Sequence, residues 1–185
     1  MPAPNGRSTS LRRTTLWIAI PLLLAGFGAY CMLSEGHDSL TRLMHAAALG
    51  RVDTVQRLVD EKTPINVQDD DEKGTALMYA IDGDFNGNAN SLLTENHEAA
   101  VKILIAAGAD VNMRNRRGET ALSKACAAYS TQLRYKDQKR ATVALHLVAL
   151  LLQAGADTQP ATAALDPAAS PPELKELLAQ SQLRK

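Results

Sequence analysis

The fold is decided by the stretch Ala100-Val101-Lys102-Ile103-Leu104-Ile105-Ala106-Ala107-Gly108-Ala109-Asp110-Val111-Asn112. Its first part has the apolar spacing of a helix, and Gly108 supplies the left-handed residue that ends such a helix. The polar residues after it suit a turn. The same ending, Leu-Leu-Gln-Ala-Gly-Ala-Asp, returns at residues 151–157. The chain therefore repeats one structural unit.

Working outward, three segments share one order of residues: 41–66, 74–112 and 118–157. Each carries a threonine that suits the N-cap of a first helix, and Leu and Ala follow it, which lets two short helices pack closely. These threonines are Thr41, Thr75 and Thr120. A unit of this size buries its apolar flank only against a neighbouring unit, so the pattern predicts a stack of helix pairs.

These segments resemble the ankyrin repeat, which opens with T-P-L-H-x-A-A and closes with G-A-D-V-N, and the resemblance covers residues 38–180. It implies an all-α ankyrin-repeat solenoid of about three repeats plus a degenerate C-terminal cap, with a short tail at 181–185. The cap spans residues 161–180, where Leu174, Leu177 and Leu178 give a helix one apolar side. Two departures from the motif stand out: the family histidine is Met44, Met78 and Ser123 here, and Lys62-Thr63-Pro64 replaces Gly-Ala-Asp.

The N-terminal part carries an uncharged apolar segment at residues 16–33, whose length is at the threshold for spanning a bilayer. Arg7, Arg12 and Arg13 precede it, so the positive-inside rule places the rest of the chain outside the cytoplasm. We expect a basic region at 1–15, a transmembrane anchor or signal peptide at 16–33 and a linker at 34–37. The predicted location is the inner membrane, single-pass with the C-terminal domain in the periplasm. The alternative is a soluble periplasmic protein after signal cleavage.

Two insertions lengthen the inter-helix connections of the second and third repeats, near residues 82–95 and 130–142. Insertions of this kind map to one face of a solenoid, so we expect them to lie side by side, either as a loop beside two lengthened, solvated helices or as functional elaborations. Asp82, Asp84 and Asn86 also resemble the start of a calcium-binding EF-hand loop. The twelfth position is Leu93 rather than Glu, which predicts at most weak calcium binding.

Nothing in the sequence predicts chemistry. The 185 residues hold 20 basic and 20 acidic side chains, so no overall charge attracts nucleic acid. The four histidines lack metal-ligand spacing, and no nucleophile elbow or phosphate-binding glycine loop occurs. We expect no enzymatic activity, cofactor, metal or small-molecule substrate. The acidic run Asp69-Asp70-Asp71-Glu72 is expected at an exposed hairpin tip, where nothing shifts its pKa values.

The resemblance implies that another protein binds to the hairpin tips and to the adjoining first-helix surfaces. The tips are residues 68–73, which are mostly acidic, and 113–117, which are mostly basic. Such alternation is able to select a partner by charge. The candidate partner-binding residues are Asp69, Asp71, Lys73, Arg114, Arg116, Arg117, His45, Tyr79 and Lys124.

Export combined with an ankyrin-like array is typical of bacterial envelope proteins. We hypothesise an immunity or inhibitor protein that binds a secreted toxin, such as a phospholipase effector. One alternative is an accessory or scaffold protein that supports an envelope enzyme or an oxidative-stress response. The other is a weak calcium-responsive binding module.

Overall fold

The computed structural model describes residues 42–83, 93–164 and 171–182, which are helical apart from turns and one antiparallel bridge between Gln68 and Thr75. Every described residue belongs to one compact unit, residues 39–185, which we call the second unit because residues 1–38 precede it. The segment at 16–33 that we predicted to enter a membrane lies outside the described residues. Among the helices that the structure does describe, none has the length and apolarity needed to cross a bilayer.

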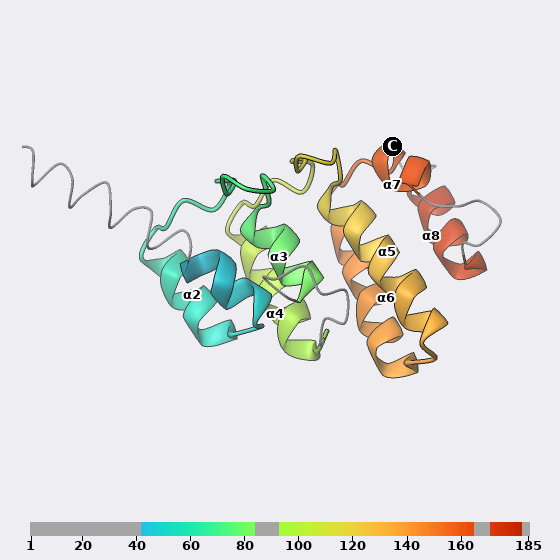
Figure 1. The fold of residues 1–185 in the computed structure, drawn as a ribbon, viewed down its shortest axis with the longest axis horizontal. Coiled ribbons are helices and arrows are strands. Elements are labelled where there is room, and N and C mark those ends of the chain that lie inside the picture. The colour runs from blue at the N-terminus through green and yellow to red at the C-terminus, as the bar shows by residue number, and fades with distance from the viewer. Residues whose placement is uncertain (1–41, 84–92, 165–170, 183–185) are drawn as a thin grey trace, which may run out of the picture. The chain divides into compact units, whose positions relative to one another are not determined.

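The helices of the second unit follow one another in pairs (Figure 1). The first pair is formed by residues 42–48 and α2 (Val52–Asp60), and the second by α3 (Ala76–Asp82) and α4 (Glu95–Ala106). The third pair is α5 (Ala121–Arg134) with α6 (Gln138–Gln153), and the last is α7 (Gln159–Ala164) with α8 (Pro172–Gln182). This order confirms the predicted all-α repeat array with a C-terminal cap.

The pairs stack in two layers. In one layer α3 contacts α5, which contacts α7, and in the other α2 contacts α4, α4 contacts α6, and α6 contacts α8. First helices therefore pack on first helices, and second helices on second helices. Each pair covers the apolar flank of the next, as expected for a solenoid.

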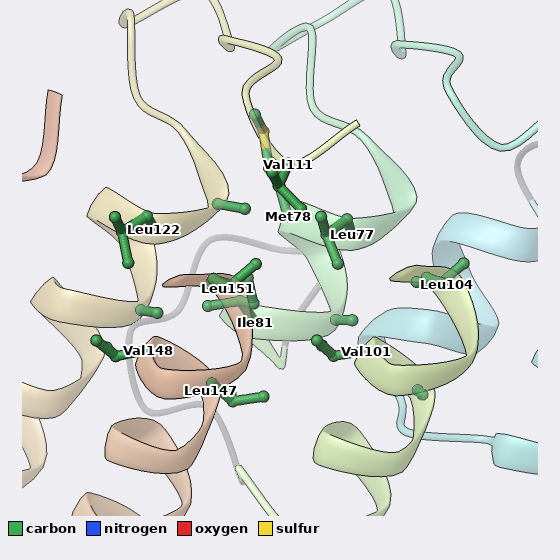
Figure 2. Packing of buried hydrophobic residues seen from close by; sticks show 14 of the residues in the cluster. Leu77, Met78, Ile81, Val101, Leu104, Val111, Leu122, Leu147, Val148 and Leu151 are labelled. Atoms are coloured by element: carbon green, nitrogen blue, oxygen red, sulfur yellow. The ribbon is translucent and has the colours of Figure 1, made fainter. Parts of the chain in front are cut away.

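The core is a periodic row of small and medium aliphatic side chains. The alanine five residues after each opening threonine is buried, at Ala46, Ala80 and Ala125. Equivalent leucines of the second helices, Leu58, Leu104 and Leu151, are fully buried as well. Figure 2 shows Leu104 and Leu151 pointing into this row together with Leu77 and Leu122 from the first helices. The small alanines let the helices of a pair approach closely.

The threonine caps form as predicted in the described repeats. The hydroxyl oxygens of Thr75 and Thr120 each accept a hydrogen bond, from the Met78 and Ser123 amides respectively, both at 3.3 Å. Ser123, which replaces the family histidine, also accepts from the Thr120 amide at 2.9 Å and completes a capping box. Thr41 lies outside the described residues.

The turn after each second helix is the same in all three repeats. Gly108 and Gly155 are left-handed, with φ of 88° and 86°, and Lys62 takes this position in the first repeat with φ of 59°. Each is followed by a residue whose amide donates back to the buried leucine of the helix, at 2.9 to 3.1 Å. Lys62-Thr63-Pro64 thus builds the turn of a Gly-Ala-Asp motif, although a non-glycine residue there costs about 1–2 kcal/mol.

Asparagine side chains hold neighbouring turns in register. Asn66 accepts from the Asp110 amide at 2.7 Å and donates to the Gly108 carbonyl at 2.9 Å. One repeat further on, Asn112 accepts from the Asp157 amide at 2.7 Å. The asparagine that closes one repeat therefore bonds the backbone of the next.

The second predicted insertion consists of helix extensions. Helices α5 and α6 continue through residues 130–142 except for a short turn at 135–137. These extensions are only partly solvated, because Gln132 and Ala141 within them are buried. The first insertion falls largely on residues 84–92, outside the described part of the chain, so the prediction that the two lie side by side stays a prediction.

The C-terminal cap forms from α7 and α8, and α8 extends two residues beyond the predicted boundary of 180. Leu174 and Leu178 are buried on its apolar side, and Leu177 is partly buried. The cap covers the flank of the third pair, since α7 contacts α5 and α8 contacts α6.

A buried histidine joins the first two repeats. His97, in the first turn of α4, accepts a hydrogen bond at Nδ1 from the Thr94 amide at 3.2 Å. Its Nε2 therefore carries the proton and donates to the Ala48 carbonyl at 3.1 Å. Burial lowers the pKa of His97 below its ordinary value of 6.5. The neutral ring is thus the form that both caps α4 and contacts the preceding repeat.

We predict that His97 makes the array less stable in mild acid. The unfolded chain takes up a proton at this position more readily than the folded chain, so its contribution is complete above about pH 6.5 and is lost as the pH falls toward the folded pKa. His97→Gln retains a capping side chain but does not titrate. Chemical denaturation at pH 7.5 and 5.5 should therefore show a smaller loss of stability for this variant than for the wild type. The exposed His45→Gln serves as control and should keep the wild-type loss; equal losses in all three proteins would contradict the prediction.

Candidate protein-binding surface

The first hairpin tip is closed by Asp69. One carboxylate oxygen accepts from the Asp71 and Glu72 amides, both at 2.8 Å, and the other accepts from the Gly74 amide at 2.7 Å. Burial raises the pKa of Asp69, but these hydrogen bonds, led by the one from Glu72, outweigh it and hold the pKa below 3.8. The expectation that nothing shifts the pKa values of this acidic run was therefore wrong for Asp69, because folding the hairpin surrounds its carboxylate with donors.

Tyr79 connects this tip to α3, the first helix of the second pair. Its hydroxyl donates to the second Asp69 carboxylate oxygen at 2.9 Å. The ring lies so close to Gly74 that a Cβ there would meet both a Tyr79 ring carbon and an Asp69 oxygen at 2.9 Å. Gly74 is thus required for the approach of the hairpin to the helix. Burial, followed by the bond to Asp69, raises the pKa of Tyr79.

Asn115 closes the second tip in the same way. Its side-chain oxygen accepts from the Arg117 amide at 3.0 Å and from the Glu119 amide at 2.8 Å. The backbone pair Asn115–Glu119 matches the pair Asp69–Gly74, except that the first loop is one residue longer. The residue before the closing position is left-handed in both loops, Lys73 with φ of 55° and Gly118 with φ of 77°.

The two tips are bonded to each other. The Arg116 amide donates to the Glu72 carbonyl at 2.8 Å, and its guanidinium donates to the Asp70 carbonyl at 2.9 Å. Gln68 donates to the Arg114 carbonyl at 2.7 Å. The exposed ion pair between Arg117 and Glu72, at 3.4 Å, adds little because water screens it. Together these hydrogen bonds join the tips into one ridge, which we call the hairpin ridge (residues 68–74 and 113–119).

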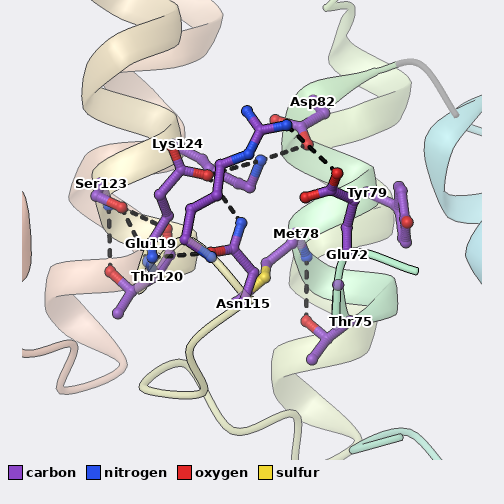
Figure 3. Close-up of polar contacts among 12 residues, drawn as sticks. Glu72, Thr75, Met78, Tyr79, Asp82, Asn115, Glu119, Thr120, Ser123 and Lys124 are labelled. Atoms are coloured by element: carbon purple, nitrogen blue, oxygen red, sulfur yellow. Dashed lines mark hydrogen bonds and ion pairs between the residues drawn. The ribbon is translucent and has the colours of Figure 1, made fainter. Parts of the chain in front are cut away.

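An ion-pair network lies below the ridge between α3 and α5 (Figure 3). Lys124 of α5 pairs with Asp82 of α3 at 2.8 Å and with Glu119 at 3.5 Å, and Glu119 accepts from the Asn115 side chain at 2.8 Å. Only 18% of the Lys124 side chain is exposed. The network couples α3 and α5, the first helices of two neighbouring repeats.

The two carboxylates of this network are shifted in opposite directions. Burial raises the pKa of Asp82, with Lys124 opposing it. Burial also acts upward on Glu119, but the hydrogen bond from Asn115 and the charge of Lys124 prevail and lower its pKa. Lys124 thus holds two anionic groups and contributes to the packing of α5 on α3.

The structure brings most of the predicted partner-binding residues together but gives them different environments. Asp71, Arg114, Arg116 and Arg117 are exposed on the hairpin ridge, and His45 is exposed on the helical residues 42–48. Asp69, Tyr79 and Lys124 are engaged inside the array, as described above. Lys73 forms an exposed pair with Asp70 at 3.5 Å.

Sequence reasoning missed residues that shape the ridge. Asn115, Glu119 and Gln68 were not predicted as site residues, although Asn before Arg-Arg-Gly is typical of a side chain that closes a turn. The bonds of Gln68 and Arg116 join residues some 45 positions apart, and no local pattern indicates them.

The predicted weak calcium site receives no support from the described residues. Asp84 and Asn86 lie outside them, and the Asp82 carboxylate is occupied by the Lys124 ammonium. In the part of the chain that the structure describes, no group of His, Cys, Asp or Glu side chains is arranged to hold a metal ion.

Stacked helix pairs, left-handed turns after each second helix and a continuous hairpin ridge define a solenoid repeat protein. Comparison with known families agrees: a model of ankyrin repeats in three copies matches residues 16–98, and a second ankyrin-repeat model matches residues 91–132. The chain therefore contains ankyrin repeats. Proteins built from ankyrin repeats are generally non-enzymatic, and such repeats indicate that this chain is a protein–protein interaction module.

A curated relative shares the repeats. The "Ankyrin repeat and SAM domain-containing protein 6" of Rattus norvegicus is 38% identical over 84 residues, which are 45% of this chain. The same stretch is 8% of the rat protein's length. The matched stretch is therefore only a small part of that relative.

We predict that Asp69 stabilises the array through its hydrogen bonds rather than by adding a surface charge. Asp69→Ala removes the acceptor of the partly buried bonds from the Gly74 amide and the Tyr79 hydroxyl, and should lower the free energy of unfolding by about 1–3 kcal/mol at pH 7. Because the folded pKa lies below 3.8, this stabilisation is present above about pH 4 and is lost as the pH falls further. Denaturant titration of the wild type and Asp69→Ala at pH 7 and at a pH below about 4 measures the difference in the free energy of unfolding. Asp71→Ala, which removes an exposed carboxylate two residues away, is the control and should change stability by less than about 0.5 kcal/mol.

Proposed function

We propose that this protein binds another protein across its hairpin ridge and the adjoining surface of the first helices. The observation that supports this most is the direct bonding of the two tips, which presents acidic and basic side chains at fixed positions. A surface that is already ordered loses little conformational entropy on binding. Its partner therefore has to match the charge order along the ridge.

The exposed charges on the ridge set the chemistry of the partner. Asp71 belongs to the acidic tip, and no described residue forms an ion pair with it. Arg114 on the basic tip is exposed as well. We expect a partner surface with a basic patch opposite the first tip and an acidic patch opposite the second.

We further propose that residues 16–33 tether the array outside the cytoplasm, in a bacterial inner membrane, and that its partner is a secreted toxin such as a phospholipase effector. The apolar segment and the preceding arginines support the tether. A small array that binds proteins and is held at the membrane suits an immunity or inhibitor role, because blocking a toxin requires binding alone. Support of an envelope enzyme is the competing role.

Capture of the partner tests the binding proposal. Full-length protein would be crosslinked in envelope preparations, and the captured proteins would be compared for the wild type and for Asp71→Lys combined with Arg114→Glu. We expect at least one protein that the ridge variant loses and that the control, Arg57→Glu with Asp60→Lys on α2, retains. Identical captured sets would contradict the use of the ridge. The captured protein should arrest growth when expressed alone in the envelope and not when this chain is coexpressed; a harmless partner would exclude the immunity role.

A reporter fusion tests the tether. Alkaline phosphatase, which is active only outside the cytoplasm, would be joined after Lys185. We expect an active fusion in the membrane fraction, with activity reduced when Arg7, Arg12 and Arg13 are changed to Glu. Activity in the soluble periplasmic fraction would indicate signal cleavage instead. An inactive fusion that is nevertheless expressed in full would overturn the predicted location.

A further inference from the structure

The third helix pair ends in a feature that the hairpin ridge does not explain. Helix α5 has 14 residues and α6 has 16, against 7 and 12 in the preceding pair. Seven additional residues correspond to roughly 10 Å of helix. The two helices meet in a turn at the side of the repeats opposite the hairpins (Figure 1). We call residues 134–140 the α5–α6 tip.

The charges of the α5–α6 tip are not balanced locally. It holds four basic residues and one acidic residue, Asp137. The Asp137 carboxylate is used within the tip, because it accepts from the Arg140 amide at 3.1 Å and pairs with the Arg140 side chain at 3.4 Å. Within the described ranges, no acidic group forms an ion pair with the other three, which are Arg134, Lys136 and Lys139. Three positive charges of the tip therefore have no ion-pair partner among the described residues, in contrast to the mixed signs of the hairpin ridge.

An aromatic side chain stands among these charges. Tyr135 is 67% exposed, the highest value among large hydrophobic side chains that are described. Apolar aromatic surface beside Arg is the composition typical of residues that dominate protein interfaces.

The α5–α6 tip is also held in a fixed conformation. The amides of Tyr135, Lys136 and Asp137 donate to the carbonyls of Thr131, Leu133 and Gln132 at 2.9 to 3.1 Å. Behind the turn, Tyr129 and Gln132 are buried against the array. The basic groups and the tyrosine are thus presented on an ordered support, which keeps the entropy cost of binding small.

We propose that the α5–α6 tip is a second docking surface, which takes an acidic protein segment that also carries an apolar side chain. The positive charges pair with carboxylates, and Tyr135 covers the apolar group. A bilayer surface fits less well, because a single exposed aromatic offers little apolar area for insertion. Nucleic acid fits less well, because the basic patch is short and the whole chain is neutral. The inference rests on the proposed function in that both ligands are proteins, but it concerns a different surface.

The test uses full-length protein in neutral detergent micelles and a short fluorescein-labelled peptide with the repeating sequence Glu-Leu-Asp, followed by fluorescence anisotropy. We expect binding that weakens with added salt. The combined variant Arg134→Glu, Lys136→Glu and Lys139→Glu should weaken it about tenfold or more, and Tyr135→Ala about tenfold. All these side chains are exposed, so circular dichroism and thermal melting should match the wild type.

Two controls separate the tip from other causes. Arg42→Glu, Arg51→Glu and Arg57→Glu change the net charge equally on the first repeat, and Arg114→Glu alters the hairpin ridge; both should leave peptide binding unchanged. Absence of peptide binding, or equal loss in the first-repeat control, would overturn the inference. So would binding through the tip to phosphatidylglycerol vesicles but not to the peptide. The two proposals fail separately. Loss of the captured envelope protein in the ridge variant tests the proposed function, and loss of peptide binding in the tip variants tests this inference.

Discussion

The array depends on one packing constraint: a pair of short amphipathic helices hides its apolar flank only when another pair covers it. Alanines at the helix contacts allow the close approach, and the leucine row fills the space between pairs. Packing alone would tolerate sliding of one pair along the next. Asn66 and Asn112 remove this freedom, because their hydrogen bonds connect each turn to one position of the following turn.

The same register brings the hairpin tips together. Backbone bonds between the tips, such as that from Arg116 to Glu72, form only when the helix pairs below them are aligned. The order of the ridge therefore depends on the alignment of the helix pairs, and the tips are not independent loops. The α5–α6 tip differs in this respect, because its order comes from two long helices of one repeat and from the residues buried beneath them.

The sequence was sufficient to predict what depends on local patterns. Threonine caps, left-handed glycines and the leucine spacing indicated the helix pairs, their order and the C-terminal cap. It was insufficient where different residues adopt one geometry, as with Lys62 at a glycine position, or where partners lie a repeat apart. Nothing local marks His97 as a link to Ala48, or Lys124 as the partner of Asp82. Exposure on the ridge was predictable from the repeat register, whereas the roles of Asp69 and Tyr79 inside it required the three-dimensional contacts.

The closing bonds of the two hairpins have a consequence for how such a protein changes over time. Asp69 and Asn115 seal loops of unequal length with equivalent backbone pairs, so a residue gained or lost between the seals is absorbed at the tip. The helices beneath keep their alignment. Exposed positions between the seals, such as Asp71, are thus free to vary with a new partner, whereas Asp69 and Asn115 have to be retained for the architecture.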